Sequence, residues 1–323
     1  MLVLRKVLLI GGGTGLSTFS RVLKNLNVDL TLIVAITDDG GSSGILREAM
    51  RIPPPGDIRN NIIALADDEE ILTGIFSHRF SSDAMKRHSL GNIIIAGLTE
   101  MYGSFPEAVK AASRLLKIRG KVLPVADALV NLVAKLDDGS IIEGESNVAL
   151  SGIRVKELSL NRQVEAMPEV LNEIEKADTV IVGPGSLYTS LIPNFLVSGV
   201  SQAFSRSKGE KVYVCNIMTQ PRESEGYDLG KHVRIVESYT KTPFDRIFWT
   251  EIGGVEESVI ERYRRSGSTP VKNDMQDDSR VTCICGATTE LIVDGRKKNV
   301  VRHSGSSILS ILKELEIYGE IAL

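Results

Sequence analysis

An apolar run that stops abruptly in a glycine loop is the feature that most limits how this chain can fold. Residues 6–10 predict a short buried strand, and residues 11–15 then read Gly-Gly-Gly-Thr-Gly. Residues 16–26 repeat leucine and phenylalanine on one helical face, and residues 30–36 form a second apolar, β-branched run. A strand, a helix and a second strand within about 30 residues predict a βαβ unit, and therefore a parallel sheet.

The rest of the chain continues as a mixture of helices and strands. Residues 38–61 are polar and predicted to be irregular, residues 267–278 predict a loop, and residues 137–139 (Asp-Asp-Gly) predict a hairpin turn. Further strands are predicted at residues 122–135, 140–145, 178–182, 211–216 and 246–250. Further helices are predicted at residues 62–80, 92–102, 106–116, 228–240, 255–265 and 306–318.

No repeat of fixed period and no low-complexity linker divides the 323 residues. We therefore predict a single α/β domain over residues 1–323, with a Rossmann-like, doubly wound, mainly parallel sheet. A mainly helical subdomain is predicted to be inserted after the second strand, at about residues 57–118.

Composition excludes several classes of protein. The formal net charge of -3, from 38 basic and 41 acidic residues, argues against a general nucleic-acid binder. No run approaches the roughly 18 apolar residues of a membrane span, and we expect a cytoplasmic protein without a signal peptide. Cys283 and Cys285 are predicted to be small residues on a buried strand, because zinc needs three or four ligands.

The first glycine loop has the chemistry of a phosphate site. Glycines let the backbone turn tightly and approach a ligand, and the N–H groups at the start of a helix attract anions. Thr14 and Ser17 add hydroxyl donors. The dinucleotide pattern G-x-G-x-x-G fails at Leu16, and the Walker A lysine is missing, which disfavours NAD binding and P-loop hydrolysis. The alternative is a tight turn without a ligand.

The second predicted strand ends in an acidic loop, Thr-Asp-Asp-Gly-Gly-Ser-Ser-Gly, at residues 37–44. Loops at the carboxyl ends of parallel strands face one crevice, so this loop and the first are expected to meet. Asp38 or Asp39 can accept hydrogen bonds from a ribose or hold Mg²⁺ against phosphates, whereas the alternative is an exposed turn. Asp57 is predicted either to cap the following helix or to take part in binding.

Later segments repeat the same features. Residues 183–190 (Gly-Pro-Gly-Ser-Leu-Tyr-Thr-Ser) and residues 216–221 (Asn-Ile-Met-Thr-Gln-Pro) each follow a predicted strand. Arg59 and Arg302 can pair with phosphate, and Tyr263 can stack on a base. The candidate binding residues are Gly12, Gly13, Thr14, Gly15, Ser17, Thr37, Asp38, Asp39, Gly41, Ser42, Ser43, Asp57, Arg59, Asn60, Asn92, Gly183, Gly185, Ser186, Tyr188, Thr189, Asn216, Thr219, Tyr263 and Arg302.

No catalytic constellation accompanies these loops. The four histidines lie in no Ser-His-Asp or metal-binding pattern. Any chemistry is therefore expected to consist of positioning a phosphate group and neutralising its charge.

Taken together, these loops resemble the CofD-like family, and within it the YvcK branch. The resemblance rests on residues 11–17, 37–44, 54–60, 90–92, 183–190 and 216–221, in a consistent order over about two-thirds of the chain. It implies a Rossmann-like fold with a nucleotide pocket. The transferase branch makes 2-phospho-L-lactate derivatives from a guanosine diphosphate-linked donor with Mg²⁺, and usually carries Asn-Pro where this chain has the loop at residue 183.

The resemblance to the YvcK branch implies a regulatory protein that binds UDP-sugars such as UDP-N-acetylglucosamine. It further implies unidentified protein partners and a need for the protein in normal cell shape and wall synthesis during gluconeogenic growth. The alternative is an Mg²⁺-dependent transferase of the 2-phospho-L-lactate type, with Asp38 or Asp39 as metal ligand. A dinucleotide-dependent oxidoreductase is a third hypothesis, disfavoured by Leu16. A homodimer is the default expectation for the assembly.

Overall fold

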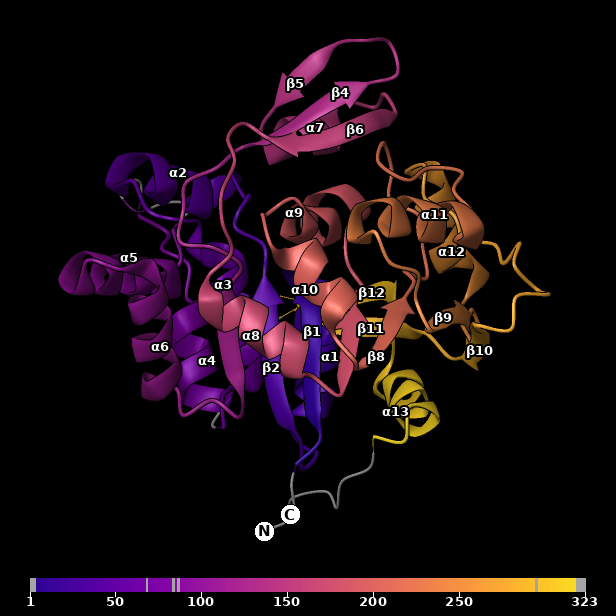
Figure 1. The fold of residues 1–323 in the computed structure, drawn as a ribbon, viewed down its shortest axis with the longest axis horizontal. Coiled ribbons are helices and arrows are strands. Elements are labelled where there is room, and N and C mark those ends of the chain that lie inside the picture. Colours follow the sequence, from indigo (N-terminus) through magenta and orange to yellow (C-terminus); the bar gives the residue numbers. More distant parts are fainter. Residues whose placement is uncertain (1–3, 68, 83–84, 86–87, 294–295, 318–323) are drawn as a thin grey trace.

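Seven parallel strands form the centre of the molecule (Figure 1). The structure is a computed structural model that describes residues 4–67, 69–82, 85, 88–293 and 296–317. The strands lie in the order β10-β9-β8-β7-β1-β2-β3, and each neighbouring pair is parallel. The predicted doubly wound α/β fold is therefore confirmed. The strands are β1 (Lys6–Gly11), β2 (Asp29–Val34), β3 (Lys121–Pro124), β7 (Thr179–Val182), β8 (Glu210–Val214), β9 (Arg246–Glu251) and β10 (Val281–Cys285).

The central strands are apolar on both faces because both faces are covered. In β1, Leu8 and Ile10 join one hydrophobic cluster, whereas Val7 and Leu9 join another. Successive side chains of a strand point to opposite faces, so the two clusters are the two helix-covered layers of the sheet. A strand that is buried on both faces requires a continuous apolar run, and such a run is easily recognised in the sequence.

Helices cover each face of the sheet. One layer contains α8 (Pro168–Lys176), α9 (Ile192–Phe195), α10 (Val200–Arg206) and α11 (Leu229–Thr240). The other contains α1 (Gly13–Leu23), α3 (Pro55–Leu65), α6 (Phe105–Leu115) and α13 (Gly305–Glu314). The helix predicted at 306–318 is thus present, although Tyr318 lies outside the described residues. Among the described residues, no helix is both long enough and apolar enough to cross a bilayer.

A helical segment connects β2 to β3, but it begins earlier than the predicted subdomain. Residues 38–61 were predicted to be irregular, and this prediction is wrong, because α2 (Gly41–Met50) and the start of α3 lie there. The buried face of α2 consists of Ser42, Ser43, Gly44 and Arg47, so the helix lacks the apolar periodicity that reveals most helices. The helix predicted at 62–80 is divided between α3 and α4 (Glu69–Ser77), and α5 (Leu90–Tyr102) follows.

A small antiparallel sheet lies apart from the central sheet, at the top of Figure 1. It contains β5 (Ile141–Glu143), β4 (Leu132–Leu136) and β6 (Val155–Leu160), with α7 (Glu145–Leu150) between β5 and β6. The predicted hairpin turn is confirmed, since the Gly139 N–H donates to the Leu136 carbonyl at 3.0 Å. The strand predicted at 122–135 is instead two strands of different sheets. Pro124 closes β3, because proline cannot donate to a ladder.

The sheet ends at β10, which carries Cys283 and Cys285. Their predicted burial is wrong, because both side chains are exposed and only Ile284 between them faces the core. An edge strand exposes alternate side chains when one face is uncovered there. A final hairpin, β11 (Thr288–Val293) with β12 (Arg296–Arg302), then returns the chain toward the first glycine loop.

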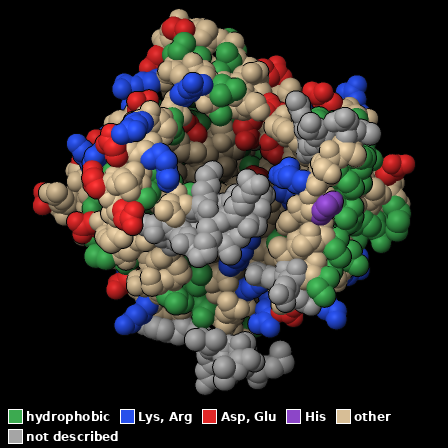
Figure 2. All heavy atoms as spheres, turned by 180° about the vertical axis from the view of Figure 1, so that it is seen from behind, with side chains coloured by type: hydrophobic (Ala, Val, Ile, Leu, Met, Phe, Trp, Pro, Cys, Tyr) green, Lys and Arg blue, Asp and Glu red, His purple; other side chains and the backbone are tan. Residues whose placement is uncertain are grey.

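Figure 2 shows the molecule from behind. Lysine and arginine side chains are interspersed with acidic ones on this face and do not gather into one basic patch. Below the top of the molecule, the surface is hollowed, and acidic side chains are visible inside the hollow.

Candidate functional site

Two glycine loops, residues 11–15 and residues 183–190, meet where the strand order changes direction, between β1 and β7. They are called the first and the second glycine loop below. In doubly wound sheets this switch point opens a crevice at the carboxyl ends of the strands. The contact is close: a Cβ atom built on Gly15 would lie 2.3 Å from the carbonyl oxygen of Pro184. Glycine is therefore required at position 15 by the approach of one loop to the other.

The first loop is held by a carboxylate from α3. The Gly13 N–H, where the backbone adopts a φ of +63°, donates to Asp57 Oδ2 at 2.7 Å. The N-cap of α1 is Gly12, so no side chain of the capping residue covers the start of that helix. The predicted capping role of Asp57 is wrong, because Pro54 is the N-cap of α3 and Asp57 lies within the first turn, bonded to Gly13.

The second loop is held by two polar side chains from later in the chain, Asn216 and Glu223. Asn216 accepts from the Gly185 N–H at 3.0 Å and donates to the Gly185 carbonyl at 2.7 Å. The buried carboxylate of Glu223 accepts from the Tyr188 N–H at 2.8 Å and from the Ser186 hydroxyl at 2.6 Å. These bonds fix the loop around the π-helical turn η1 (Leu187–Leu191). The second loop therefore fixes the shape of the wall that it forms, and the polar groups named here are already bonded within the protein.

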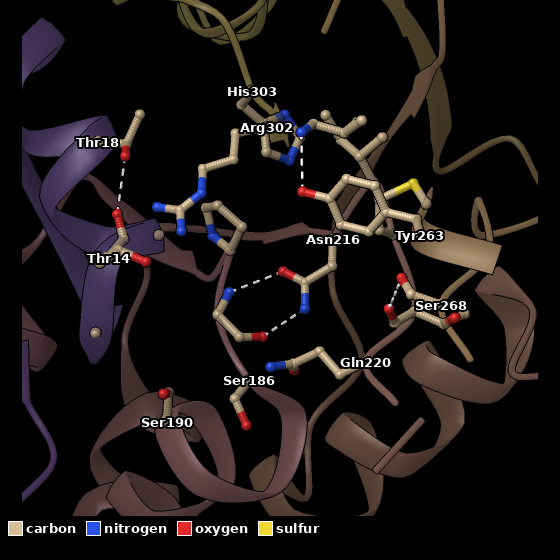
Figure 3. Close-up of a pocket in the computed structure, with 18 of the residues that line it drawn as sticks. Thr14, Thr18, Ser186, Ser190, Asn216, Gln220, Tyr263, Ser268, Arg302 and His303 are labelled. Atoms are coloured by element: carbon tan, nitrogen blue, oxygen red, sulfur yellow. Dashed lines mark hydrogen bonds between the residues drawn. The ribbon is translucent and has the colours of Figure 1, made fainter. Parts of the chain in front are cut away.

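A cavity of about 430 Å³ opens between the two loops (Figure 3). Among the described residues that line it, Arg302 is the one charged side chain. Its guanidinium group points toward Thr14 at the start of α1, and it makes no hydrogen bond or ion pair with a described residue (Figure 3). Burial lowers the pKa of Arg302 below its usual value. The cavity thus has a concentrated positive potential at one end, from this arginine and the helix start.

The other end of the cavity is apolar with a polar rim. Ile217, Met218 and Val301 belong to one small hydrophobic cluster, and the ring of Tyr263 packs against it. The Tyr263 hydroxyl accepts from the Val301 N–H at 3.1 Å, which fixes the ring beside the cavity. The remaining lining residues include Thr18, Ser190, Thr219, Gln220, Ser266 and Ser268.

His303 lines the cavity but is held as a neutral structural residue. Its Nε2 lies 3.0 Å from the Cys215 carbonyl and its Nδ1 lies 3.2 Å from the Thr250 hydroxyl. Burial lowers its pKa to about 4. Since Nε2 donates to a carbonyl, the neutral ring has a defined tautomer with Nδ1 as acceptor. His303 is therefore not a general base for chemistry in this cavity at neutral pH.

This burial gives a pH-dependent contribution to stability. The unfolded chain protonates His303 near pH 6.5, whereas the folded protein resists protonation until about pH 4. Acidification from pH 6.5 to pH 4 therefore removes roughly 3 kcal/mol from the free energy of unfolding through this group. The difference in unfolding free energy between wild type and His303→Gln, measured with urea, is expected to shrink by that amount over this interval. A constant difference would contradict the assignment.

Carboxylates gather behind the first loop. Burial is the largest cause of the raised pKa values of Asp38, Asp57 and Glu145. The charge of Asp38 further raises the pKa values of Asp57 and Glu145. The pKa of Asp57 rises to about 6, and that of Glu145 rises well above its usual value. The Thr37 hydroxyl donates to Glu145 Oε2 at 3.1 Å, and Asp39 accepts from the Ser146 N–H at 2.9 Å. The small sheet is thereby connected to the end of β2 through α7.

Several predicted binding residues bond with one another instead of facing the cavity. Arg59 donates to Asn92 Oδ1 at 3.0 Å and to Asn60 Oδ1 at 2.8 Å, and Asn92 donates to the Ser42 hydroxyl at 3.0 Å. This network joins α3, α5 and α2. Arg59 therefore organises the helices that carry Asp57, and the structure does not place it against the cavity.

The cavity thus gathers some of the predicted residues and leaves others outside. Those that line it are Gly12, Gly13, Thr14, Gly15, Gly185, Ser186, Asn216, Thr219, Tyr263 and Arg302. Those outside it are Ser17, Thr37, Asp38, Asp39, Gly41, Ser42, Ser43, Asp57, Arg59, Asn60, Asn92, Gly183, Tyr188 and Thr189. Thr18, Ser266 and Ser268 line it without having been predicted. Only Thr18 had a usable signal, since it lies one helical turn after Thr14.

Comparison with known proteins places the chain in a family. Residues 7–289 match the family of the 2-phospho-L-lactate transferase CofD. A gluconeogenesis factor from Bacillus subtilis is 39% identical over 315 residues, covering 96% of this chain and 98% of that protein. A Thermotoga maritima protein, also named among the gluconeogenesis factors, is 44% identical over 313 residues, covering 96% and 99%.

A solved structure agrees with the fold over its full length. The crystal structure of a Bacillus halodurans protein superposes with a TM-score of 0.88 at 37% identity, covering 96% of this chain and 100% of that one. A second crystal structure from the same organism, described as a member of the UPF0052 family, gives a TM-score of 0.89 at 36% identity. The chain therefore belongs to the CofD family, in the YvcK branch whose members are named gluconeogenesis factors.

Proposed function

We propose that this protein is a regulator that binds a UDP-sugar, such as UDP-N-acetylglucosamine, in the cavity between its two glycine loops. The observation that carries the proposal is Arg302, which faces the start of α1 without a described partner (Figure 3). A guanidinium group opposite a helix N-terminus is an arrangement that binds phosphate oxygens. In the proposal, the diphosphate lies between Arg302 and Thr14.

The apolar end of the cavity suits a nucleobase. Tyr263, Met218 and Ile217 offer a flat apolar surface on which a base can stack. Gln220 Oε1 is buried and has no hydrogen-bond partner among the described residues. A buried acceptor without a donor costs free energy, and the imide N–H of uracil is a donor of the required kind. The sugar would then reach the hydroxyl-rich rim.

The contents of the cavity favour binding over reaction. The described lining residues include no acidic side chain, and the histidine that lines it is locked by two hydrogen bonds. A bound nucleotide-sugar would therefore find positioning groups but no general base. We propose that the bound form acts in the cytoplasm on protein partners in wall synthesis, that it supports cell shape during gluconeogenic growth, and that the functional unit is a homodimer.

Calorimetric titration tests the central proposal. The wild-type protein is expected to bind UDP-N-acetylglucosamine more tightly than GDP or NAD, with no consumption of the ligand. Arg302→Ala is expected to weaken binding at least about tenfold, because a charged hydrogen-bond donor to phosphate is lost. Arg154→Ala, an exposed arginine outside the cavity, is the matched control and should bind like wild type. Absence of UDP-sugar binding to the wild-type protein would sink the proposal.

The carboxylates behind the first loop support a second candidate function, an Mg²⁺-dependent transferase of the type that gives the family its description. Mg²⁺ prefers carboxylate oxygens and is often held by one or two carboxylates together with substrate phosphates. Asp38 and Asp39 offer such oxygens, although no group of three or more His, Cys, Asp and Glu side chains within the described ranges is placed to enclose a metal ion. In this alternative, the donor phosphates would lie beside Asp38 and Asp39 instead of between Arg302 and Thr14, and Mg²⁺ would neutralise their charge.

This second candidate predicts metal-dependent product formation from a nucleotide diphosphate-linked donor. Asp39→Ala is expected to abolish that turnover while leaving UDP-sugar affinity unchanged, since Asp39 does not line the cavity. Product analysis by chromatography, with and without Mg²⁺, measures it. An unchanged rate in Asp39→Ala would remove Asp39 as a metal ligand.

A further inference from the structure

A second cavity of about 370 Å³ lies between α2 and the small antiparallel sheet. Its volume is within the range of small-molecule sites, and it shares no described lining residue with the first cavity. The cavity is lined by residues of α2 and its flanks, and by residues in α7 and in or beside the strands of the small sheet. The lining residues are Asp39, Gly44, Arg47, Glu48, Arg51, Leu129, Asn131, Glu143, Gly144, Asn147 and Asn161.

Arg47 is the unusual member of this lining. It is only 8% exposed and makes no ion pair within 4.0 Å with any described carboxylate, although Asp38, Asp39, Glu48 and Glu145 stabilise its charge at longer range. Its Nη2 donates to the Val130 carbonyl and to Asn131 Oδ1, whereas its Nε and Nη1 have no partner among the described residues. A buried guanidinium is costly unless its charge and its donors are satisfied. Neither Nε nor Nη1 of Arg47 is among the fully buried polar atoms that lack a partner, and Arg47 lines the cavity, so a ligand there can reach these donors.

The opposite wall is built from amides in fixed positions. Asn131 and Asn161 both donate to Glu143 Oε1, and Asn147 donates to the Glu143 carbonyl at 2.7 Å. Asp39 is similarly engaged, because Ser146 donates to its Oδ1 from both backbone and hydroxyl. These bonds hold the wall rigid while leaving further lone pairs. Hydroxyl groups are the natural partners for such a mixture of amides and carboxylates.

The lining holds two arginines and three carboxylates, Asp39, Glu48 and Glu143. Asp39 and Glu143 already accept hydrogen bonds from Ser146 and from the amide side chains, so the arginines are the groups left to bind an anion. Arg47 and Arg51 are four residues apart on α2 and its C-cap, and both line the cavity. Arg51 is exposed at the rim beside Glu48. Guanidinium groups bind carboxylate and phosphate in a fork geometry. Leu129 is the one large apolar side chain among the described lining residues, so a hydrophobic ligand is disfavoured.

We propose that this cavity is a second ligand site, for a small polyhydroxylated molecule with one anionic group, such as a sugar acid or a sugar phosphate. The anionic group lies against Arg47 and Arg51, and the hydroxyls bond to the amide wall at Asn147 and Asn161. A ligand in this position bridges α2 and the small sheet. The site shares no described lining residue with the nucleotide cavity, so its occupancy does not depend on UDP-sugar binding there, although Asp39, the metal ligand of the alternative transferase function, lines it.

Calorimetric titration of the full chain with gluconate and with glucose 6-phosphate tests the proposal. Glucose, which has only the hydroxyls, and inorganic phosphate, which has only the anionic group, are the half-ligand probes for comparison. At least one of the two complete probes is expected to bind more tightly than either half-ligand. Which of the two binds tells whether the anion is a carboxylate or a phosphate. Arg51→Ala, at the exposed rim, and Asn147→Ala should each weaken that binding about tenfold.

Two controls separate this site from the first. Arg302→Ala and Arg154→Ala should both bind the probe like wild type, since neither residue lines the second cavity. The proposal is overturned if neither gluconate nor glucose 6-phosphate binds, or if Arg51→Ala and a folded Asn147→Ala bind as tightly as wild type. Loss of binding in Arg302→Ala would likewise overturn it, because that result would place the probe in the nucleotide cavity.

Discussion

Gly15→Ala is expected to abolish UDP-sugar binding and to lower the free energy of unfolding by about 3 kcal/mol or more. The added Cβ would lie 2.3 Å from the Pro184 carbonyl oxygen and 2.9 Å from its carbon. Both atoms belong to the backbone, so no side chain can rotate away and the second glycine loop must move. That movement would displace the wall of the cavity opposite α1, where the diphosphate is proposed to bind.

Urea denaturation and calorimetric titration measure the two effects of Gly15→Ala. The matched control is Gly97→Ala in α5, where an added Cβ meets no atom within 4 Å. That variant should gain about 1 kcal/mol, because alanine is favoured over glycine within a helix, and should bind like wild type. A Gly15→Ala protein that folds and binds normally would show that the two loops do not pack as described.

Asp57→Asn is expected to stabilise the protein at neutral pH, although it changes a residue beside the glycine loop. Burial raises the pKa of Asp57 to about 6 from 3.8, so the folded protein favours the protonated acid. Ionisation in the folded state therefore costs stability, and the cost grows as pH rises from 3.8 to 6. Above pH 6 it reaches about 3 kcal/mol. Asparagine removes the buried charge, and its Oδ1 still accepts from Gly13.

The measurement is the unfolding free energy of wild type and Asp57→Asn between pH 4 and pH 8. The gain of the variant over wild type should be near zero at pH 4 and reach its full value above pH 6. Only the difference at each pH is informative, because His303 changes stability in the opposite direction over much of this interval. Asp277→Asn, at an exposed carboxylate, should stay within about 0.5 kcal/mol of wild type. A variant less stable than wild type at pH 7 would mean that the ionised Asp57–Gly13 bond outweighs the cost of burial.

A stabilising Asp57→Asn would also bear on function. Proteins seldom keep a buried charge that lowers their stability unless an activity needs it. If the variant gains stability but loses UDP-sugar affinity, Asp57 is kept to position the first glycine loop. If it gains stability and keeps affinity, the carboxylate serves the transferase chemistry proposed for its neighbours Asp38 and Asp39.

The sequence predicts a helix or strand correctly where burial alone determines its pattern of apolar residues. β1 and β2 are mainly apolar because both of their faces are buried after the first residue, so both strands can be predicted without knowing which strands they pair with. The helix α2 was missed because its buried face consists of small polar residues and Arg47. β6 was missed because its side chains are largely exposed, which leaves little alternation to detect.

The residues of the candidate site also divide into those that a local sequence pattern predicts and those that it does not. Gly12, Gly13 and Gly15 could be predicted because glycine at a strand end has a local geometric meaning. Ser268 could not, because it reaches the cavity only through a segment that bonds to Thr219, 49 residues away in sequence. The role of Asp57 was misjudged for a related reason. Its bond to Gly13 spans 44 residues, whereas a helix cap is visible in the sequence beside it.

The bonds that hold the second glycine loop have a consequence for how this family can diversify. Glu223 and Asn216 fix the shape of that loop whether or not a ligand is present. In the proposed complex, α1 and Arg302 bind the diphosphate, and the surface near Tyr263 binds the base. Substitutions near Tyr263 and Gln220 can therefore change which nucleotide is recognised without rebuilding the diphosphate cradle. If the protein binds a nucleotide diphosphate as proposed, evolution or a protein engineer would be able to exchange it for another by altering a few side chains near Tyr263.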